Sequence, residues 1–227
     1  MNFETALRAT EMLLAFAFLL QSAEHAAARR DEQLLHLPRL LLSALLLLGV
    51  ATPFVLLALC GLGLALLRRF QGPYNGGSDK MSLLILTCLT LAHLLPARPW
   101  QELVFAYLAA QLVLSYFISG QVKIMNPDWR TGRALQDVFA YSAYPVSEGL
   151  RGYAARPGLL FAMSWAVMLF ELLFPLALFH REALMLALFT AALFHLANAC
   201  LFGLNRFFWI WLAAYPSILW LQNRLVL

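Results

Sequence analysis

Long stretches without charged residues run through most of the chain and are separated by short polar segments. One such stretch, residues 157–180, carries a single charge at Glu171. These stretches show no strict alternation of apolar and polar positions, so they predict helices and not strands. A helix needs about 20 mostly apolar residues to cross a bilayer. The fully uncharged stretches are residues 40–67, 81–97, 103–122, 183–205 and 207–223.

The stretch 40–67 is too long for one ordinary membrane span. Its middle contains Gly49, Thr52 and Pro53. Gly49 suits a helix C-terminus, Thr52 an N-cap and Pro53 the first helical position. We therefore expect two helices joined by a tight turn, with a single helix kinked at Pro53 as the alternative.

The fold class expected is all-α: a polytopic bundle of about eight transmembrane helices in one transmembrane domain covering residues 1–227. A polar connection, residues 123–157, mixes aromatic and basic side chains, as short interfacial helices do. With eight spans, most basic residues fall on one side of the membrane, which by the positive-inside rule also holds this connection. A seven-span arrangement separates the basic residues less well. The helices are expected near residues 5–27, 34–49, 53–70, 80–96, 100–122, 158–179, 182–204 and 206–224.

Composition agrees with a membrane protein. Hydrophobic residues make up 62% of the 227 residues and charged residues only 12%, against roughly 25% charged in an average soluble domain. This excludes a soluble domain, a disordered chain and a nucleic-acid binder with a large basic face. We therefore interpret the net charge of +4 as a consequence of membrane topology, since most basic residues fall on one side of the membrane. We expect the chain to lie in the lipid bilayer of a bacterial inner membrane. We expect no nucleic-acid partner.

The familiar sequence signatures of metal and nucleotide sites are missing. The three cysteines lie singly inside apolar stretches, without CxxC spacing, so they predict neither a disulfide framework nor a metal centre. No HExxH, P-loop or G-x-S-x-G motif occurs. We expect no metal cofactor.

Ionisable residues within predicted spans are candidate functional groups, because burying them in a bilayer is costly. Lys123 ends a row of polar residues at steps of four and is either a snorkelling lysine or a base. Glu171 is either a structural carboxylate paired with a basic residue or a proton carrier. His195 and Asn198 face the same way on one helix and are either structural or a ligand-facing pair.

Two further groups of polar residues look structural. Arg8 and Glu11 stand at i, i+3 and are expected to form an ion pair. His93, near Thr87 and Thr90, is expected to be a packing residue.

Three segments resemble the HTTM family, the membrane-domain family that includes vitamin K-dependent gamma-carboxylase. Residues 116–124, YFISGQVKI, are followed by Asp128-Trp129 and by the Gly132–Leu135 stretch. Residues 170–175, FELLFP, and residues 194–198, FHLAN, then follow in the family's order. The resemblance is strongest over residues 75–210. DoxX-like quinone-linked proteins share a shorter element of the first segment.

The resemblance implies quinone chemistry. In the carboxylase, a lysine at the position of Lys123 deprotonates vitamin K hydroquinone, and a histidine at the position of His195 assists. The implied cofactor is thus a quinone or hydroquinone. We take Lys123 and His195 as candidate catalytic residues. Asn198, Glu171, Trp129 and Arg130 are candidate ligand contacts.

The chain also departs from the carboxylase pattern. Gly77 stands where the carboxylase has a further functional histidine, and no large extramembrane domain is expected after the last apolar stretch. The positive-inside orientation places Lys123 towards the cytoplasm, opposite to what the resemblance implies. Carboxylation of a docked protein is therefore not expected.

Two functions remain open at this level. The first is a quinol-dependent membrane enzyme with Lys123 as base, acting on a lipid-soluble or peptide substrate. The second is a non-enzymatic maturation or accessory factor with a membrane or secreted peptide partner. A small-solute transporter ranks last, because the sequence shows no internal inverted repeat.

Overall fold

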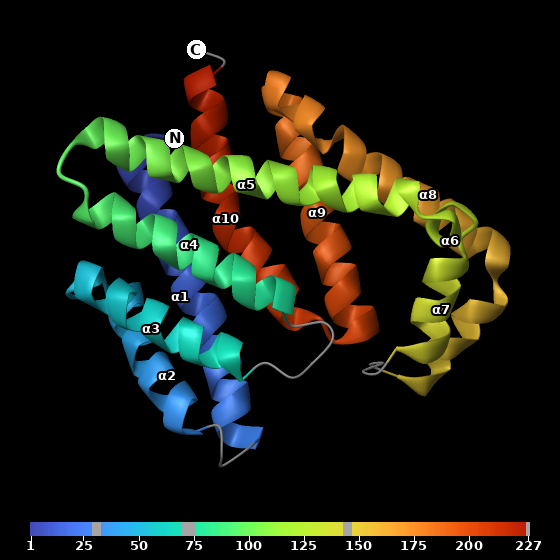
Figure 1. Cartoon of the computed structure of the whole chain (residues 1–227), viewed down its shortest axis with the longest axis horizontal. Coiled ribbons are helices and arrows are strands. Elements are labelled where there is room, and N and C mark those ends of the chain that lie inside the picture. The colour runs from blue at the N-terminus through green and yellow to red at the C-terminus, as the bar shows by residue number, and fades with distance from the viewer. Residues whose placement is uncertain (29–32, 70–75, 143–146, 226–227) are drawn as a thin grey trace. The chain divides into compact units, whose positions relative to one another are not determined.

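A computed structural model describes residues 1–28, 33–69, 76–142 and 147–225, and over these residues the chain is helical without strands (Figure 1). Each predicted apolar stretch forms a helix, which confirms the all-α class. The long helices are α1 (Phe3–Ala28), α2 (Gln33–Leu48), α3 (Thr52–Arg68), α4 (Gly76–Leu94), α5 (Arg98–Met125), α8 (Pro157–Leu173), α9 (Arg181–Phe202) and α10 (Asn205–Leu225). The polar connection contains α6 (Pro127–Arg130), α7 (Arg133–Tyr141) and the 3₁₀ helix η2 (Glu148–Ala155), as predicted.

The chain divides into two compact units. The first contains residues 1–110 and 206–225, and therefore α1 to α4, the first half of α5 and α10. The second contains residues 111–205, and therefore the second half of α5 and all elements through α9.

The tight turn predicted between α2 and α3 is present. Gly49 has φ +73°, the left-handed conformation that glycine adopts without steric cost. Pro53 lies in the first turn of α3, where its missing N–H costs nothing. The prediction of Thr52 as N-cap was wrong, because the helix already begins at Thr52. Ala51 is the N-cap, with φ +49° and no side-chain hydrogen bond.

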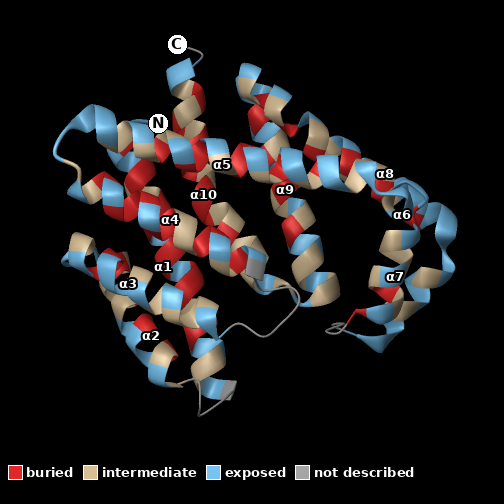
Figure 2. Cartoon of the chain, in the orientation of Figure 1, coloured by how far each residue is buried: buried red, intermediate tan, exposed pale blue. Residues whose placement is uncertain are grey.

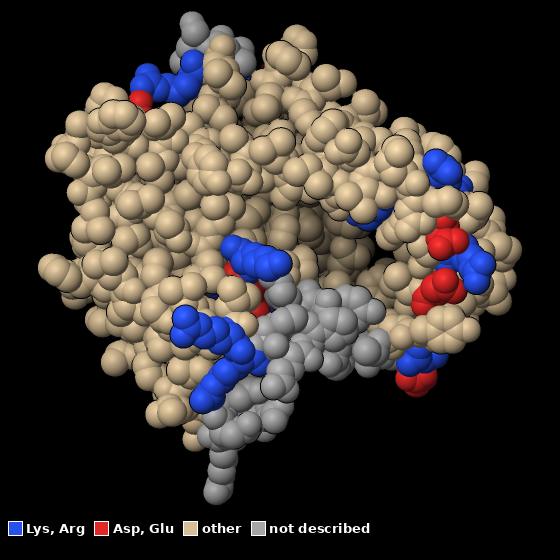
Figure 3. All heavy atoms as spheres, viewed as in Figure 1, with Lys and Arg blue, Asp and Glu red and all other residues tan. Residues whose placement is uncertain are grey.

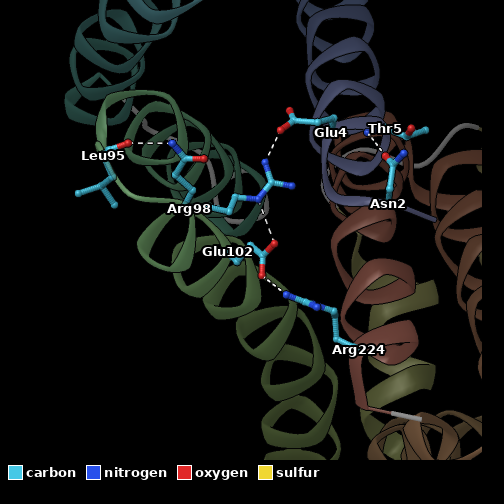
Figure 4. A network of polar contacts seen from close by, with 8 residues as sticks. Asn2, Glu4, Thr5, Leu95, Arg98, Glu102 and Arg224 are labelled. Carbon is cyan, nitrogen blue, oxygen red and sulfur yellow. Dashed lines mark hydrogen bonds and ion pairs between the residues drawn. The ribbon is translucent and has the colours of Figure 1, made fainter. Parts of the chain in front are cut away.

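In the first unit, polar contacts hold the ends of several helices together. At one end, shown in Figure 4, Arg98 at the start of α5 donates hydrogen bonds to Glu4 of α1 and, at 3.0 Å, to Glu102. Arg224 near the end of α10 also donates to Glu102. The start of α1, the start of α5 and the end of α10 therefore lie together.

The same end of the first unit holds a buried acid. Glu11 accepts a 2.8 Å hydrogen bond from Arg8, which confirms the predicted ion pair. His93, expected to be a packing residue, instead lies 2.5 Å from the other Glu11 oxygen. Arg8 also donates to the carbonyls of Leu46 and Leu47, at 2.9 and 2.6 Å. It thereby caps the end of α2, where the Leu46 carbonyl also accepts a hydrogen bond from the Gly49 N–H.

Much of the outer surface is apolar. Exposed large hydrophobic residues occur on every long helix, such as Phe54 at 75% and Leu186 at 67% exposed, while the buried positions face neighbouring helices (Figure 2). The face drawn in Figure 3 is largely uncharged, with lysines, arginines and acids confined to small groups. Such extensive exposed apolar surface suits a bilayer and not water.

Within the described residues, three helical segments are long and apolar enough to cross a membrane. They are Arg98–Met125, Pro157–Phe179 and Arg181–Phe202. Gln33–Leu48 and Thr52–Arg68 are shorter apolar helices. The chain is thus an integral membrane protein by length and composition of its helices, whereas the expected count of about eight spans is not confirmed.

Candidate functional site

One face of the second half of α5 carries the polar side chains of the candidate site. Tyr116, Ser119, Gly120 and Lys123 stand at i, i+3, i+4 and i+7, so they lie along one side of the helix. Ser115, an earlier member of the polar row, does not join them, because its hydroxyl donates a hydrogen bond to the carbonyl of Leu112 at 2.7 Å.

Lys123 and Glu171 form the centre of the site. The Nζ atom of Lys123 lies 2.8 and 2.7 Å from the two carboxylate oxygens of Glu171 and 2.5 Å from Oγ of Ser119. Ser119 also donates to Glu171 Oε1 at 3.2 Å. The side chains of Lys123 and Glu171 are 16% and 3% exposed. All three ammonium hydrogens therefore have acceptors, in a setting largely shielded from water.

Two local features bring Glu171 to Lys123. Gly120 allows α5 and α8 to approach closely, because a Cβ there would lie 2.8 Å from the backbone nitrogen of Leu172 and 3.0 Å from Cβ of Glu171. Pro175 has no N–H to donate to the Glu171 carbonyl. The α-helix accordingly ends at Leu173 and continues as the 3₁₀ helix η3 (Phe174–Phe179), so Glu171 lies in the last α-helical turn.

His195 lies in the same unit and contacts Tyr116. The hydroxyl of Tyr116 and Nε2 of His195 are 2.9 Å apart, and both residues are buried. The Tyr116 ring stacks on Phe174 with a centroid distance of 4.2 Å and meets the edge of Phe170 at 6.1 Å. His195 therefore faces the same side of α5 as Lys123, two helical turns away along that helix.

Trp129 and Arg130 have different surroundings. The ring of Trp129 lies 5.3 Å from Nζ of Lys123, within the usual cation–π range. Arg130 turns back to the end of α5 and donates to the carbonyl of Ile124 at 3.2 Å. Backbone carbonyls of both residues accept hydrogen bonds from α8, from Ser164 at 2.5 Å and from the indole of Trp165 at 3.0 Å. These two bonds fasten α6 to α8.

Asn198 lies one turn beyond His195 on α9 and is partly buried. Its backbone carbonyl accepts hydrogen bonds from Gly203 and Leu204, which close the end of α9. Among the residues described, the structure thus groups Lys123, Glu171 and Trp129, links His195 to Tyr116, and gives Arg130 a contact at the end of α5.

Three residues of this site, Tyr116, Gly120 and Ser119, were not selected as candidates from the sequence. Tyr116 was noted only as part of the YFISGQVKI segment, although its position seven residues before Lys123 already placed both on one helix face. Gly120 lies in the same segment and signals a close backbone approach. Ser119 was noted only as one of a row of polar positions.

The site can hold and move a proton. In a setting of low dielectric constant, a lysine–glutamate pair exists as an ion pair or, after transfer of one proton, as amine and carboxylic acid. The aromatic rings of Tyr116, Phe170 and Phe174 pack against one another on the His195 side of this site. Among the described residues, no group of three potential metal ligands comes together.

The comparisons with known proteins agree with the motifs. The family model of the HTTM domain matches residues 97–222, a segment that contains the whole candidate site. No curated protein and no solved structure matches the chain. The matched segment covers more than half of the 227 residues, and the chain therefore belongs to the HTTM family.

Proposed function

We propose that this HTTM protein abstracts a proton from a lipid-soluble hydroquinone, with Lys123 as the base and Glu171 as the group that takes up the lysine's proton. The observation that carries the proposal is the contact of Lys123 with both oxygens of Glu171, at 2.8 and 2.7 Å, inside a membrane helix pair. We also place the protein in a bacterial inner membrane.

Lys123 can act as a base only when it is neutral. Transfer of its proton to Glu171 produces that amine without creating a net charge, because ammonium and carboxylate become amine and acid. When the amine then accepts a proton from a substrate hydroxyl, the pair has gained one proton in total. Ser119 contacts both groups and keeps the two side chains in position during this proton transfer.

A bound hydroquinone would supply the acidic hydroxyl. His195 and Tyr116 share a hydrogen bond, and we propose that this pair orients the hydroxyl towards Lys123. Trp129 lies beside the ammonium, and we propose that its ring limits the access of water to it. Asn198, one turn further along α9, and Arg130 are proposed as contacts to more distant parts of the substrate or peptide.

The proposal is tested with protein in nanodiscs that contain a hydroquinone, kept anaerobic and then exposed to oxygen. The rate of hydroquinone loss is followed by ultraviolet absorbance. Loss of a positioned acid–base group typically costs about 10²–10⁴-fold, so Lys123→Met and Glu171→Gln should each reduce the protein-dependent rate by such a factor. Lys80→Gln, which removes an exposed lysine of α4, is the matched control and should leave it unchanged.

A double variant, Lys123→Met with Glu171→Leu, separates catalysis from folding. Replacing both partners of a buried ion pair with apolar residues is commonly tolerated, whereas removing one partner leaves an uncompensated charge. The double variant should fold and be inactive. A folded double variant with the wild-type rate, or a wild-type protein that does not accelerate hydroquinone loss, would contradict the proposal.

A non-enzymatic accessory role is the second candidate. It is favoured by the hydrogen bonds of the Lys123 ammonium, because all three of its hydrogens have acceptors within the protein. A lysine–glutamate pair with a purely structural role would have the same arrangement. This function predicts a stable membrane or secreted peptide partner recovered by pull-down. It also predicts that the folded double variant still binds the partner and still supports function in cells.

A further inference from the structure

A second buried cation lies in the first unit, far from the HTTM motifs in sequence. Arg39 of α2 is 3% exposed, and its guanidinium lies over the ring of Phe18, 3.8 Å from the ring centroid. Its Nη1 atom is buried and has no hydrogen-bond partner among the residues described. A buried charged donor that is left unused is costly, so this atom marks a place where an acceptor would stabilise the protein.

A second unused polar atom lies on the helix that faces Arg39. Phe18, Ser22 and His25 stand at i, i+4 and i+7 on α1, and therefore on one side of that helix. Phe18 contacts Arg39, and His25 stacks on His36 of α2 at a centroid distance of 4.5 Å. Ser22 lies between these two contacts, and its fully buried hydroxyl has no partner among the residues described.

The charges around Arg39 do not cancel its own. Asp79 of α4 and Arg206 of α10 are its charged neighbours. The Asp79 carboxylate is already shared with Arg206, whose Nη1 atom lies 3.9 Å from it. Arg206 also hydrogen bonds to His25. Two guanidinium groups thus share the neighbourhood of one carboxylate, and the imidazole of His25, which stacks on that of His36, contacts Arg206.

The cluster lies where three helices of the first unit begin or end. His25 lies in the last turn of α1, Asp79 in the first turn of α4 and Arg206 is the second residue of α10. These helix ends lie together, and they are the ends opposite to the Arg98–Glu102–Arg224 group. The Asp79 and Arg206 side chains are 15% and 18% exposed, so this is the side from which solvent or headgroups reach the cluster.

We propose that Arg39, Ser22 and Arg206 form a binding site for a phosphate-type oxyanion at this end of the first unit. The planar fork of a guanidinium matches phosphate oxygens, and two arginines with a hydroxyl supply donors around one anion. The anion is either the headgroup phosphate of an acidic phospholipid or free inorganic phosphate. This proposal is independent of the chemistry at Lys123.

Thermal unfolding of the full chain in nanodiscs distinguishes the two sources. Three samples are compared: phosphatidylcholine alone, phosphatidylcholine with phosphatidylglycerol, and phosphatidylcholine alone with added inorganic phosphate. A higher unfolding temperature with phosphatidylglycerol supports a lipid ligand. A higher temperature with inorganic phosphate supports free phosphate. If neither raises the unfolding temperature of the wild-type protein, the proposal is wrong.

Variants locate the effect at Arg39. Arg39→Gln should weaken binding of the stabilising anion about tenfold or more, because a charge-assisted hydrogen bond is lost. Arg68→Gln removes an exposed arginine at the end of α3 and should change binding little. Binding is measured from the anion concentration, or mole fraction of acidic lipid, at half-maximal stabilisation.

Arg39→Lys is the variant to measure if Arg39→Gln does not fold. It keeps the charge and loses the two-pronged geometry, so it should also weaken binding about tenfold. Equal binding by the wild-type protein, Arg39→Lys and Arg68→Gln would overturn the assignment to Arg39.

Discussion

Replacing Gly120 with alanine tests whether the close approach of α5 and α8 is required for the Lys123–Glu171 pair. The added Cβ would lie 2.8 Å from the backbone nitrogen of Leu172, whereas ordinary contacts begin at 3.4 Å. The two helices must therefore separate by about 0.6 Å. Overpacking of this kind costs about 1–3 kcal/mol. The helical preference of alanine over glycine returns about 0.5–1 kcal/mol, so the net loss of stability should be about 0–2.5 kcal/mol.

The stability change is measured as the free energy of unfolding in mixed micelles of increasing SDS fraction. Gly61 of α3 provides the matched control, because a Cβ there meets no atom within 4 Å. Gly61→Ala should stabilise the protein by about 0.5–1 kcal/mol, since only the helical preference changes. The reasoning would be refuted if Gly120→Ala were as stable as Gly61→Ala, because the contact with the Leu172 backbone would then carry no cost.

Three further predictions concern contacts outside the Lys123–Glu171 pair. Glu11→Ala should destabilise the protein by about 2–3 kcal/mol in the same unfolding assay, because it removes a buried carboxylate that pairs with two partly exposed partners, Arg8 and His93; a loss below about 0.5 kcal/mol would argue against that role. Ser164→Ala should cost about 1 kcal/mol and speed amide exchange around Trp129, whose carbonyl loses its donor; unchanged exchange there would contradict the contact. The hydrogen bond from Arg151 lowers the pKa of Glu148 below its ordinary 4.5, so the local stability of η2 should be full above pH 4.5 and fall as the pH drops below it. Amide exchange of η2 should therefore accelerate below pH 4.5 in the wild-type protein, and an identical acceleration in Glu148→Gln would show that another group is responsible.

Sequence patterns were sufficient for the helices and for much of the candidate site. The uncharged stretches placed each long helix to within a few residues, because the length and apolar character of such segments are set by the bilayer. The turn after Gly49 followed from glycine's tolerance of positive φ. Thr52 was misplaced as N-cap because the turn is made by Ala51 in a left-handed conformation, which no residue preference indicates.

Partner choice was less predictable than helix position. The sequence left open whether Glu171 pairs with an arginine or a lysine, since that depends on which helices pack together. Spacing along one helix cannot show that His195 meets Tyr116, nor that His93 meets Glu11. Each of these contacts joins helices that are distant in sequence, and packing of the apolar faces decides them.

The atoms that crowd Gly120 also determine how a defect there could be corrected genetically. The nearest atom to an added Cβ is the main-chain nitrogen of Leu172, which no substitution at that position removes. The corresponding contact at Gly63 of α3 is the terminal Cδ2 of Leu83, at the same 2.8 Å. A smaller residue at position 83 would therefore suppress Gly63→Ala directly. Suppressors of Gly120→Ala would have to arise elsewhere and act by shifting a whole helix.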